Sequence, residues 1–218
     1  MLQPRYLLHT GEGDRFGEAV HHIDVYAFDS LGIYRKMFRD KGAHLKNGYR
    51  MPIDLPEGKW TFLCLGGKVG DYEIGIFKTG IPQQFSPAVS PGITTLSDFR
   101  VKAYFEQKEN LEYSFGELFF GRLDSVEITA DNGGTGVVDL MKNTNKIEVR
   151  VKGIADGSSA RITSDNGRFN SENVTPADAG TIIYVPYYSA SQADDTRVFQ
   201  FDVLRLYTDC LLYTSDAA

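Results

Sequence analysis

The sequence predicts an all-β protein that folds as two β-sandwiches, and three observations support this. Hydrophobic and polar residues alternate with period two in many segments, as in strands that bury one face. Turn residues separate these segments at fairly regular intervals. No segment carries an amphipathic helical pattern longer than about three turns. The 218 residues suffice for one large or two ordinary domains.

The expected strands follow one another along the whole chain. A hairpin is expected first, because the alternating segment 22–28 meets a turn at 29–32 and returns over 33–38. Pro56-Glu57-Gly58 is a second strong turn, which opens the next strand. The further turns contain Asp-Asn-Gly. The remaining expected strands cover residues 59–65, 99–105, 126–130, 146–152, 181–188 and 197–207.

Two of these strands have clearly assigned faces. In the strand 59–65 we expect Trp60, Phe62 and Cys64 to face the core of the first sandwich, with Thr61 and Leu63 on the other side of the sheet. In the strand 146–152 every odd residue is β-branched and every even residue is charged. We therefore expect Ile147, Val149 and Val151 to be buried, and Glu148, Arg150 and Lys152 to be solvated.

Other segments are less regular. Residues 99–105 fit a helix or a strand, and the alternation favours a strand. Residues 78–96 contain three prolines, which predicts a long loop without regular structure. We place the boundary between the sandwiches near Glu127, so that residues 1–127 form the first and 128–209 the second.

Composition excludes several classes of function. The formal net charge of -6, without a Lys/Arg cluster, argues against nucleic-acid binding. No stretch reaches the roughly 18 apolar residues that a membrane-spanning helix needs. The N-terminus, MLQPRYLLHT, lacks the pattern of an export signal, so the protein is either cytosolic or has lost its signal.

The last nine residues, CLLYTSDAA, resemble the conceptual translation of a sequencing-library adapter. We expect residues 210–218 not to be native, and the natural protein to continue beyond Asp209 with another sequence. Cys64 is then the single cysteine.

A search for catalytic, cofactor-binding or metal-binding residues assigns none. Adjacent His21 and His22 point to opposite faces of an extended chain, and nothing around His9 or His44 suggests a ligand set. Cys64 lies in a hydrophobic row, as structural cysteines do. The acidic residues of the turns fit turn chemistry better than calcium binding; they are Asp131, Asp165, Asp194 and Asp195. Glu172 could form a carboxylate pair with Asp194-Asp195, but the sequence sets no distance between them. No glycine pattern forms a phosphate-binding loop.

The chain resembles the FimB-like fimbrial anchor family of Bacteroidales, the accessory subunits of type V pili. The resemblance extends from Tyr6 to about Thr208 and depends on the order and spacing of several segments. These are 25–29 (VYAFD) with Gly32, 55–60 (LPEGKW), 118–121 (LFFG), 140–147 (LMKNTNKI), 165–169 (DNGRF), 184–187 (YVPY) and 204–206 (LRL).

The resemblance implies two tandem transthyretin-like β-sandwiches, the second of them truncated in this chain. It also implies a non-enzymatic protein at the outer membrane and cell surface, held there by a lipid anchor absent from this fragment. The implied partners are fimbrial (pilin) subunits, bound by β-strand addition. The alternative is a ligand- or glycan-binding surface lipoprotein, with Tyr184, Tyr187 and Tyr188 stacking on sugar rings. For these tyrosines we favour a structural role, in which they form one face of a buried strand and two residues at its rim.

Overall fold

Fifteen strands and two short helical segments make up the computed structural model, which describes residues 1–7, 13–78, 84–103, 116–131, 133–155, 157–177, 179–192 and 194–205. The elements are β1 (Leu2–Tyr6), α1 (Phe16–Ala19), β2 (His22–Phe28), β3 (Tyr34–Lys41), β4 (Gly58–Gly67), η1 (Val69–Asp71), β5 (Tyr72–Lys78), β6 (Gln84–Ser86), β7 (Phe99–Ala103), β8 (Leu118–Ile128), β9 (Gly136–Lys142), β10 (Thr144–Lys152), β11 (Ile162–Ser164), β12 (Arg168–Asn170), β13 (Ile182–Tyr184), β14 (Tyr188–Ser191) and β15 (Thr196–Leu204). The all-β prediction is confirmed.

The largest sheet has six strands in the order β1-β9-β8-β4-β2-β3. Its pairs are antiparallel except β1 with β9, which run parallel. A four-stranded sheet, β12-β7-β5-β6, packs against one face. The layer between the two sheets includes Phe28 of β2 and Phe99 of β7, whose rings meet edge to face at 5.9 Å. These two sheets form a β-sandwich.

The other face of the six-stranded sheet is also covered. Trp60, Phe62 and Cys64 of β4 lie there in one buried cluster with Phe16 of α1. Leu63 belongs to the cluster between the sheets. The two faces of β4 alternate as expected, but Trp60, Phe62 and Cys64 do not face the layer between the two sheets. Leu63 lies in that layer, and the face that carries Trp60, Phe62 and Cys64 is buried because α1 and the segment that follows β3 cover it.

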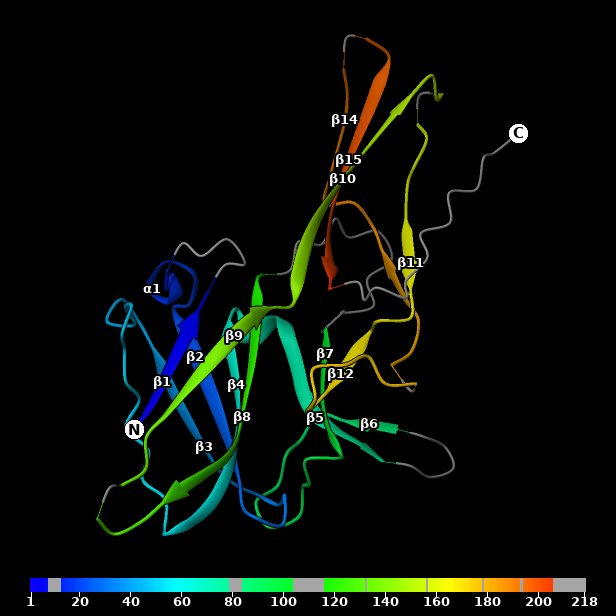
Figure 1. Ribbon diagram of the computed structural model, residues 1–218. Helices are drawn as coiled ribbons and strands as arrows, with labels where there is room; N and C mark the ends of the chain where they lie inside the picture. Colours follow the sequence, from blue (N-terminus) through cyan, green and yellow to red (C-terminus); the bar gives the residue numbers. More distant parts are fainter. Residues whose placement is uncertain are drawn as a thin grey trace.

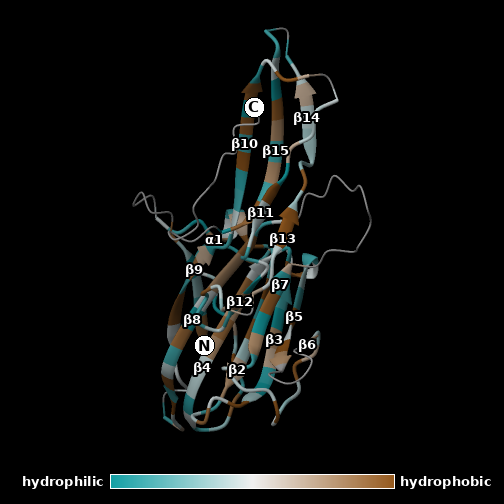
Figure 2. Cartoon of the chain, turned by 90° about the vertical axis from the view of Figure 1, so that its right-hand side faces the viewer, coloured by the Kyte–Doolittle hydropathy of each residue, from teal (hydrophilic) through white to brown (hydrophobic). Residues whose placement is uncertain are grey.

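The second half of the chain forms a three-stranded sheet, β10-β15-β14, and a two-stranded sheet, β11-β13. The three-stranded sheet extends away from the six-stranded one (Figure 1), and hydrophobic positions run along β15 in Figure 2. The alternation predicted for β10 is present, since Glu148, Arg150 and Lys152 are exposed. The β-branched row opposite is half-buried rather than buried, because β10 is an edge strand that β15 flanks on one side.

Several expected elements differ from the structure. The proline-rich segment 78–96 contains the short strand β6, which pairs with β5. The ambiguous segment 99–105 is a strand, β7, over Phe99–Ala103. The strand expected over 181–188 is divided into β13 and β14, and Pro186 lies between them.

Strands from the second half of the sequence also contribute to the first sandwich. β9 lies beyond the boundary expected near Glu127, yet it pairs with β1 and β8 in the six-stranded sheet. β12 returns to pair with β7 in the four-stranded sheet. Residues 210–218 lie outside the described residues. Within the described ranges, no helix is long and apolar enough to cross a membrane.

Candidate functional site

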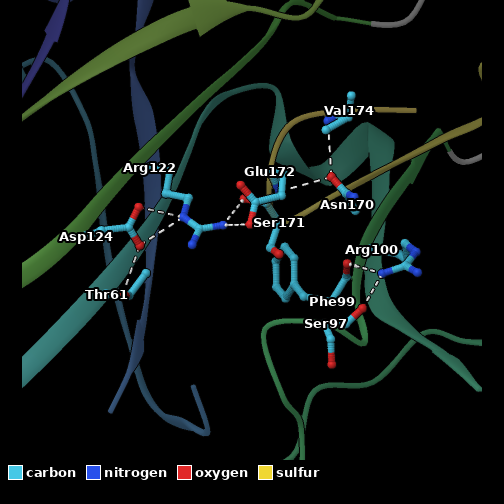
Figure 3. A network of polar contacts seen from close by, with 10 residues as sticks. All are labelled: Thr61, Ser97, Phe99, Arg100, Arg122, Asp124, Asn170, Ser171, Glu172 and Val174. Carbon is cyan, nitrogen blue, oxygen red and sulfur yellow. Dashed lines mark hydrogen bonds and ion pairs between the residues drawn. The ribbon is translucent and has the colours of Figure 1, made fainter. Parts of the chain in front are cut away.

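A polar network joins β8 of the first sandwich to the turn that follows β12 (Figure 3). The Arg122 side chain donates through Nε to both carboxylate oxygens of Asp124, at 2.9 Å each. Its Nη1 donates to the Ser171 carbonyl at 3.3 Å and forms an ion pair with Glu172. Asn170 shapes this turn, because its Oδ1 accepts the backbone N–H groups of Glu172 and Val174.

A second set of contacts lies next to the first. The side-chain amides of Asn143 and Asn173 bond to each other in both directions. Asn173 adopts a left-handed backbone conformation with φ of 58°, which asparagine tolerates better than most residues. Arg205 donates to the Asn173 carbonyl at 3.0 Å. The turn 170–174 is thus held by Arg122 of β8, by Asn143, which follows β9, and by Arg205, which follows β15.

These contacts orient the chain more than they stabilise it. The side chains of Asp124 and Glu172 are 51% and 60% exposed, so each ion pair is worth at most about 1 kcal/mol. Sequence reasoning found neither Arg122 nor Asn143. No local signal marks their contacts with the turn, since Ser171 and Glu172 lie 49 and 50 residues from Arg122, and Asn173 lies 30 residues from Asn143.

Two of the histidines take part in structural polar contacts. His22 bonds to buried Asp24, and His44 bonds to Asp40. His9 lies outside the described residues, and His21 is exposed. No group of three His, Cys, Asp or Glu side chains that could hold a metal occurs among the residues with described positions.

The other residues considered for catalysis or metal binding, Cys64, Asp165 and Glu172, have structural roles. Cys64 is a free, fully buried cysteine, and burial raises the pKa of its thiol, which suppresses the thiolate. Asp165 accepts a hydrogen bond from Thr181 at 2.6 Å. Glu172, considered above as a carboxylate partner of Asp194-Asp195, instead pairs with Arg122 in the polar network.

The three tyrosines considered for sugar stacking do not form a common surface. Tyr184 is 2% exposed, and its hydroxyl donates to Asn166 at 2.8 Å inside the protein. The Tyr187 ring lies 5.1 Å from the Lys146 ammonium, and Tyr188 is 47% exposed on β14. A sugar would therefore not find three coplanar exposed rings here.

A shallow cleft of about 530 Å³ lies at the β2–β3 end of the first sandwich. Its charged side chains are already paired, Arg35 with Asp29 at 2.6 Å and Lys36 with Asp54 at 3.6 Å. The Trp60 ring in its wall is 6% exposed, and its indole N–H donates to the Pro56 carbonyl. The cleft offers a ligand little unpaired chemistry.

The outer edges of the sheets are the other candidate interaction surfaces. The six-stranded sheet ends on β1 and β3, and the three-stranded sheet ends on β10 and β14. β10 is the longest of these edges, with nine residues. In the described part of the chain it pairs with β15 alone. A sheet edge of this kind presents unpaired N–H and C=O groups to an extended partner.

Comparison with solved structures supports the fold. The fimbrial anchor protein Mfa2 from Porphyromonas gingivalis is 19% identical, with a TM-score of 0.74, over 95% of this chain and 73% of that one. A candidate polysaccharide-binding protein from Bacteroides thetaiotaomicron is 20% identical, with a TM-score of 0.76 over 96% and 72% of the two chains. A candidate adhesin from Bacteroides ovatus is 23% identical, with a TM-score of 0.74 over 96% and 69%.

A family model gives the stronger result. No curated protein matches the chain significantly. The model of the fimbrillin-A associated anchor proteins Mfa1 and Mfa2, however, matches residues 1–214. This match confirms the resemblance to fimbrial anchors that the ordered sequence segments indicate. The chain therefore belongs to the family of fimbrillin-A associated anchor proteins Mfa1 and Mfa2.

Proposed function

We propose that this protein is a cell-surface fimbrial anchor or accessory subunit that binds a fimbrial subunit by β-strand addition. Membership of the anchor family implies association with fimbriae at the cell surface, and the family is structural rather than catalytic. The observation that carries the mechanism is β10, a nine-residue edge strand that pairs on one side alone within the described residues. Strand addition uses such an edge and requires no activated side chain.

The physical character of strand addition distinguishes it from pocket binding. Its affinity comes from main-chain hydrogen bonds, so most single side-chain truncations along the edge should matter little. A proline should matter much more, because it removes one N–H donor and its ring clashes with the neighbouring chain.

Binding of the full-length protein to the fimbrial subunits of its own strain tests this proposal. Amide hydrogen exchange, measured with and without the subunit, should show new protection along one edge strand. Alanine and proline scans of each edge then separate main-chain pairing from side-chain recognition. Equal effects of alanine and proline along every edge, or protection confined to a cleft, would overturn strand addition.

We further propose that the chain comprises two transthyretin-like β-sandwiches. The expected division near Glu127 gains support from the separate sheets of the second half, and sheet membership favours a position near Asn143, where β9 passes into β10. The Arg122 network would then hold the turn after β12, a segment that returns from the second half of the chain, against β8 of the first sandwich. Arg122→Met should make this turn more accessible to limited proteolysis. An unchanged digestion pattern would contradict this role for Arg122.

Attachment to the outer membrane through a lipid anchor also remains a proposal, supported by the family membership. Metabolic labelling of the full-length gene product with a radioactive fatty acid would test it, and an unlabelled product would refute it. The alternative function, glycan binding, would be favoured instead if glycan arrays gave saturable binding to the protein without any fimbrial subunit.

A further inference from the structure

The sequence contains three Asn-Gly pairs, which begin at Asn47, Asn132 and Asn166. An asparagine that precedes glycine is the most reactive kind of asparagine, because the glycine nitrogen can attack the side-chain amide and no Cβ hinders its approach. Asn132 lies outside the described residues. The fold places the other two pairs in opposite environments.

Asn47 lies in an exposed turn of the segment that follows β3. The Tyr49 N–H donates to the Lys46 carbonyl at 2.9 Å, so Asn47 and Gly48 are the two central residues of a β-turn. Gly48 has a φ of 79°, which the second central position of a type II turn requires. Nothing lies within 4 Å of the point that a Cβ of Gly48 would occupy. The turn therefore leaves both residues open to water and to reaction.

The atoms that would react at this turn are not held by other bonds. In the described part of the chain, neither the Gly48 N–H nor Nδ2 of Asn47 makes a hydrogen bond. Oδ1 of Asn47 accepts the Gly17 N–H of α1 at 2.7 Å. Negative charge develops on this oxygen when the Gly48 nitrogen attacks Cγ, and a donor in that position stabilises such charge. A Cβ at Gly17 would lie 2.7 Å from the Lys46 Cα, so the close approach of the turn to α1 needs glycine there.

Asn166 shows the opposite arrangement. The residue is 4% exposed, its Nδ2 donates to the Leu204 carbonyl at 3.1 Å, and its Oδ1 accepts the Tyr184 hydroxyl at 2.8 Å. The Gly167 N–H, which would have to attack, donates to the Gly180 carbonyl at 3.2 Å. These bonds must break before Asn166 can react.

We propose that Asn47 is a site of spontaneous modification, at which the folded protein loses ammonia and gains an aspartyl or isoaspartyl residue. The Gly48 nitrogen gives up its proton and forms a bond to Cγ of Asn47. The bond from Cγ to Nδ2 breaks, ammonia leaves with that proton, and a five-membered imide remains. Water, the single co-reactant, then opens the imide at either carbonyl. One opening restores the ordinary main chain with a carboxylate side chain, and the other directs the main chain through Cβ and Cγ. This proposal is independent of the proposed function.

The modification alters the cover of a buried face. Leu45, on one side of the turn, is 1% exposed, and the Tyr49 ring, on the other side, stacks on Phe16 of α1 with ring centroids 6.2 Å apart. Both side chains pack in the cluster that contains Cys64. Isoaspartate adds one carbon to the main chain inside the turn that Lys46 and Tyr49 close, so Leu45 and Tyr49 can no longer both keep their positions. The cover over Cys64 should loosen as a result.

Peptide mapping of the full-length protein tests the site. The protein is incubated at mildly alkaline pH, folded in one sample and unfolded in guanidinium chloride in the other. Trypsin releases the three Asn-Gly pairs in separate peptides, and chromatography with mass spectrometry distinguishes their asparaginyl, aspartyl and isoaspartyl forms. In the folded sample we expect Asn47 to react at least about tenfold faster than Asn166, because Asn166 must first lose its hydrogen bonds. In guanidinium chloride the two rates should converge.

Thermal unfolding and thiol labelling test the effect on the cover. Aged wild-type protein should melt at a lower temperature than fresh protein, and its Cys64 should react faster with a thiol reagent. Asn47→Gln aged in the same way is the control, since glutamine would have to form a larger, six-membered ring. This variant should keep the melting temperature and the Cys64 labelling of a fresh sample.

Three results would count against the proposal. If Asn47 stays intact in the folded protein, the fold protects the turn and the site is wrong. If Asn47 and Asn166 react equally fast in the folded protein, the contacts of the two side chains do not control the reaction and the inference is also wrong. If protein modified at Asn47 melts and labels like fresh protein, the loosening of the cover is refuted.

Discussion

Arg39→Met should destabilise the protein strongly, because it leaves a buried carboxylate without its cation. The Asp24 side chain is 0% exposed and lies on β2, beside Arg39 of β3. Arg39 donates to both carboxylate oxygens, at 2.7 and 2.6 Å, and His22 bonds to the same group at 2.9 Å. Loss of one partner from a buried ion pair typically costs about 3–5 kcal/mol. Because the Arg39 side chain is 52% exposed, we expect a cost at the lower end, about 3 kcal/mol.

The assay is thermal unfolding followed by circular dichroism at neutral pH. For a chain of this size, about 3 kcal/mol corresponds to a fall in melting temperature of about 6–12 °C. Arg35→Met is the matched control, since Arg35 lies on the same strand and pairs with the less deeply buried Asp29. An ion pair of that kind contributes at most about 1 kcal/mol.

The double variant Asp24→Asn/Arg39→Met separates loss of the pair from loss of packing. A neutral amide at position 24 costs much less to bury than an unpaired carboxylate, so the double variant should regain part of the lost stability. Equal losses for Arg39→Met and Arg35→Met, or a double variant no more stable than Arg39→Met, would refute the reasoning.

Three further predictions follow from described contacts. Cys64 should not react with a thiol reagent in the native protein and should react after denaturation, since burial raises its pKa and blocks access; fast native labelling would contradict its position. The hydrogen bond from Tyr49 lowers the pKa of Asp40, so the stability that this carboxylate provides is complete above its unfolded pKa of about 3.9 and is lost as pH falls through its lower folded pKa. Asp40→Asn should therefore reduce the fall in melting temperature at acid pH, and an equal fall in wild type and variant would contradict this. Val149→Asp should lower the melting temperature more than Arg150→Asp, by about 1–2 kcal/mol in stability, and the reverse order would show that the faces of β10 are misassigned.

Strand identity could be predicted wherever the local pattern was strong. The alternation in β10 and the row of Trp60, Phe62 and Cys64 in β4 both appear in the structure, although the β4 row packs under α1 and not between the two sheets. The failures occur where local signals compete. Three prolines concealed β6, and Pro186 divided one expected strand into two.

The sequence by itself determined the all-β class, the strand faces and the family, because side-chain alternation and the order of segments are local and linear properties. Only the tertiary structure decided which strands pair. The parallel pairing of β1 with β9 brings Leu2 beside Gly136, and the return of β12 to β7 brings Phe169 beside Val101. Neither pairing leaves a local mark, since a strand shows the same alternation whichever neighbour it has. The same reason explains why the Arg122 network emerges from the fold alone, since it depends on which segment the fold places beside β8.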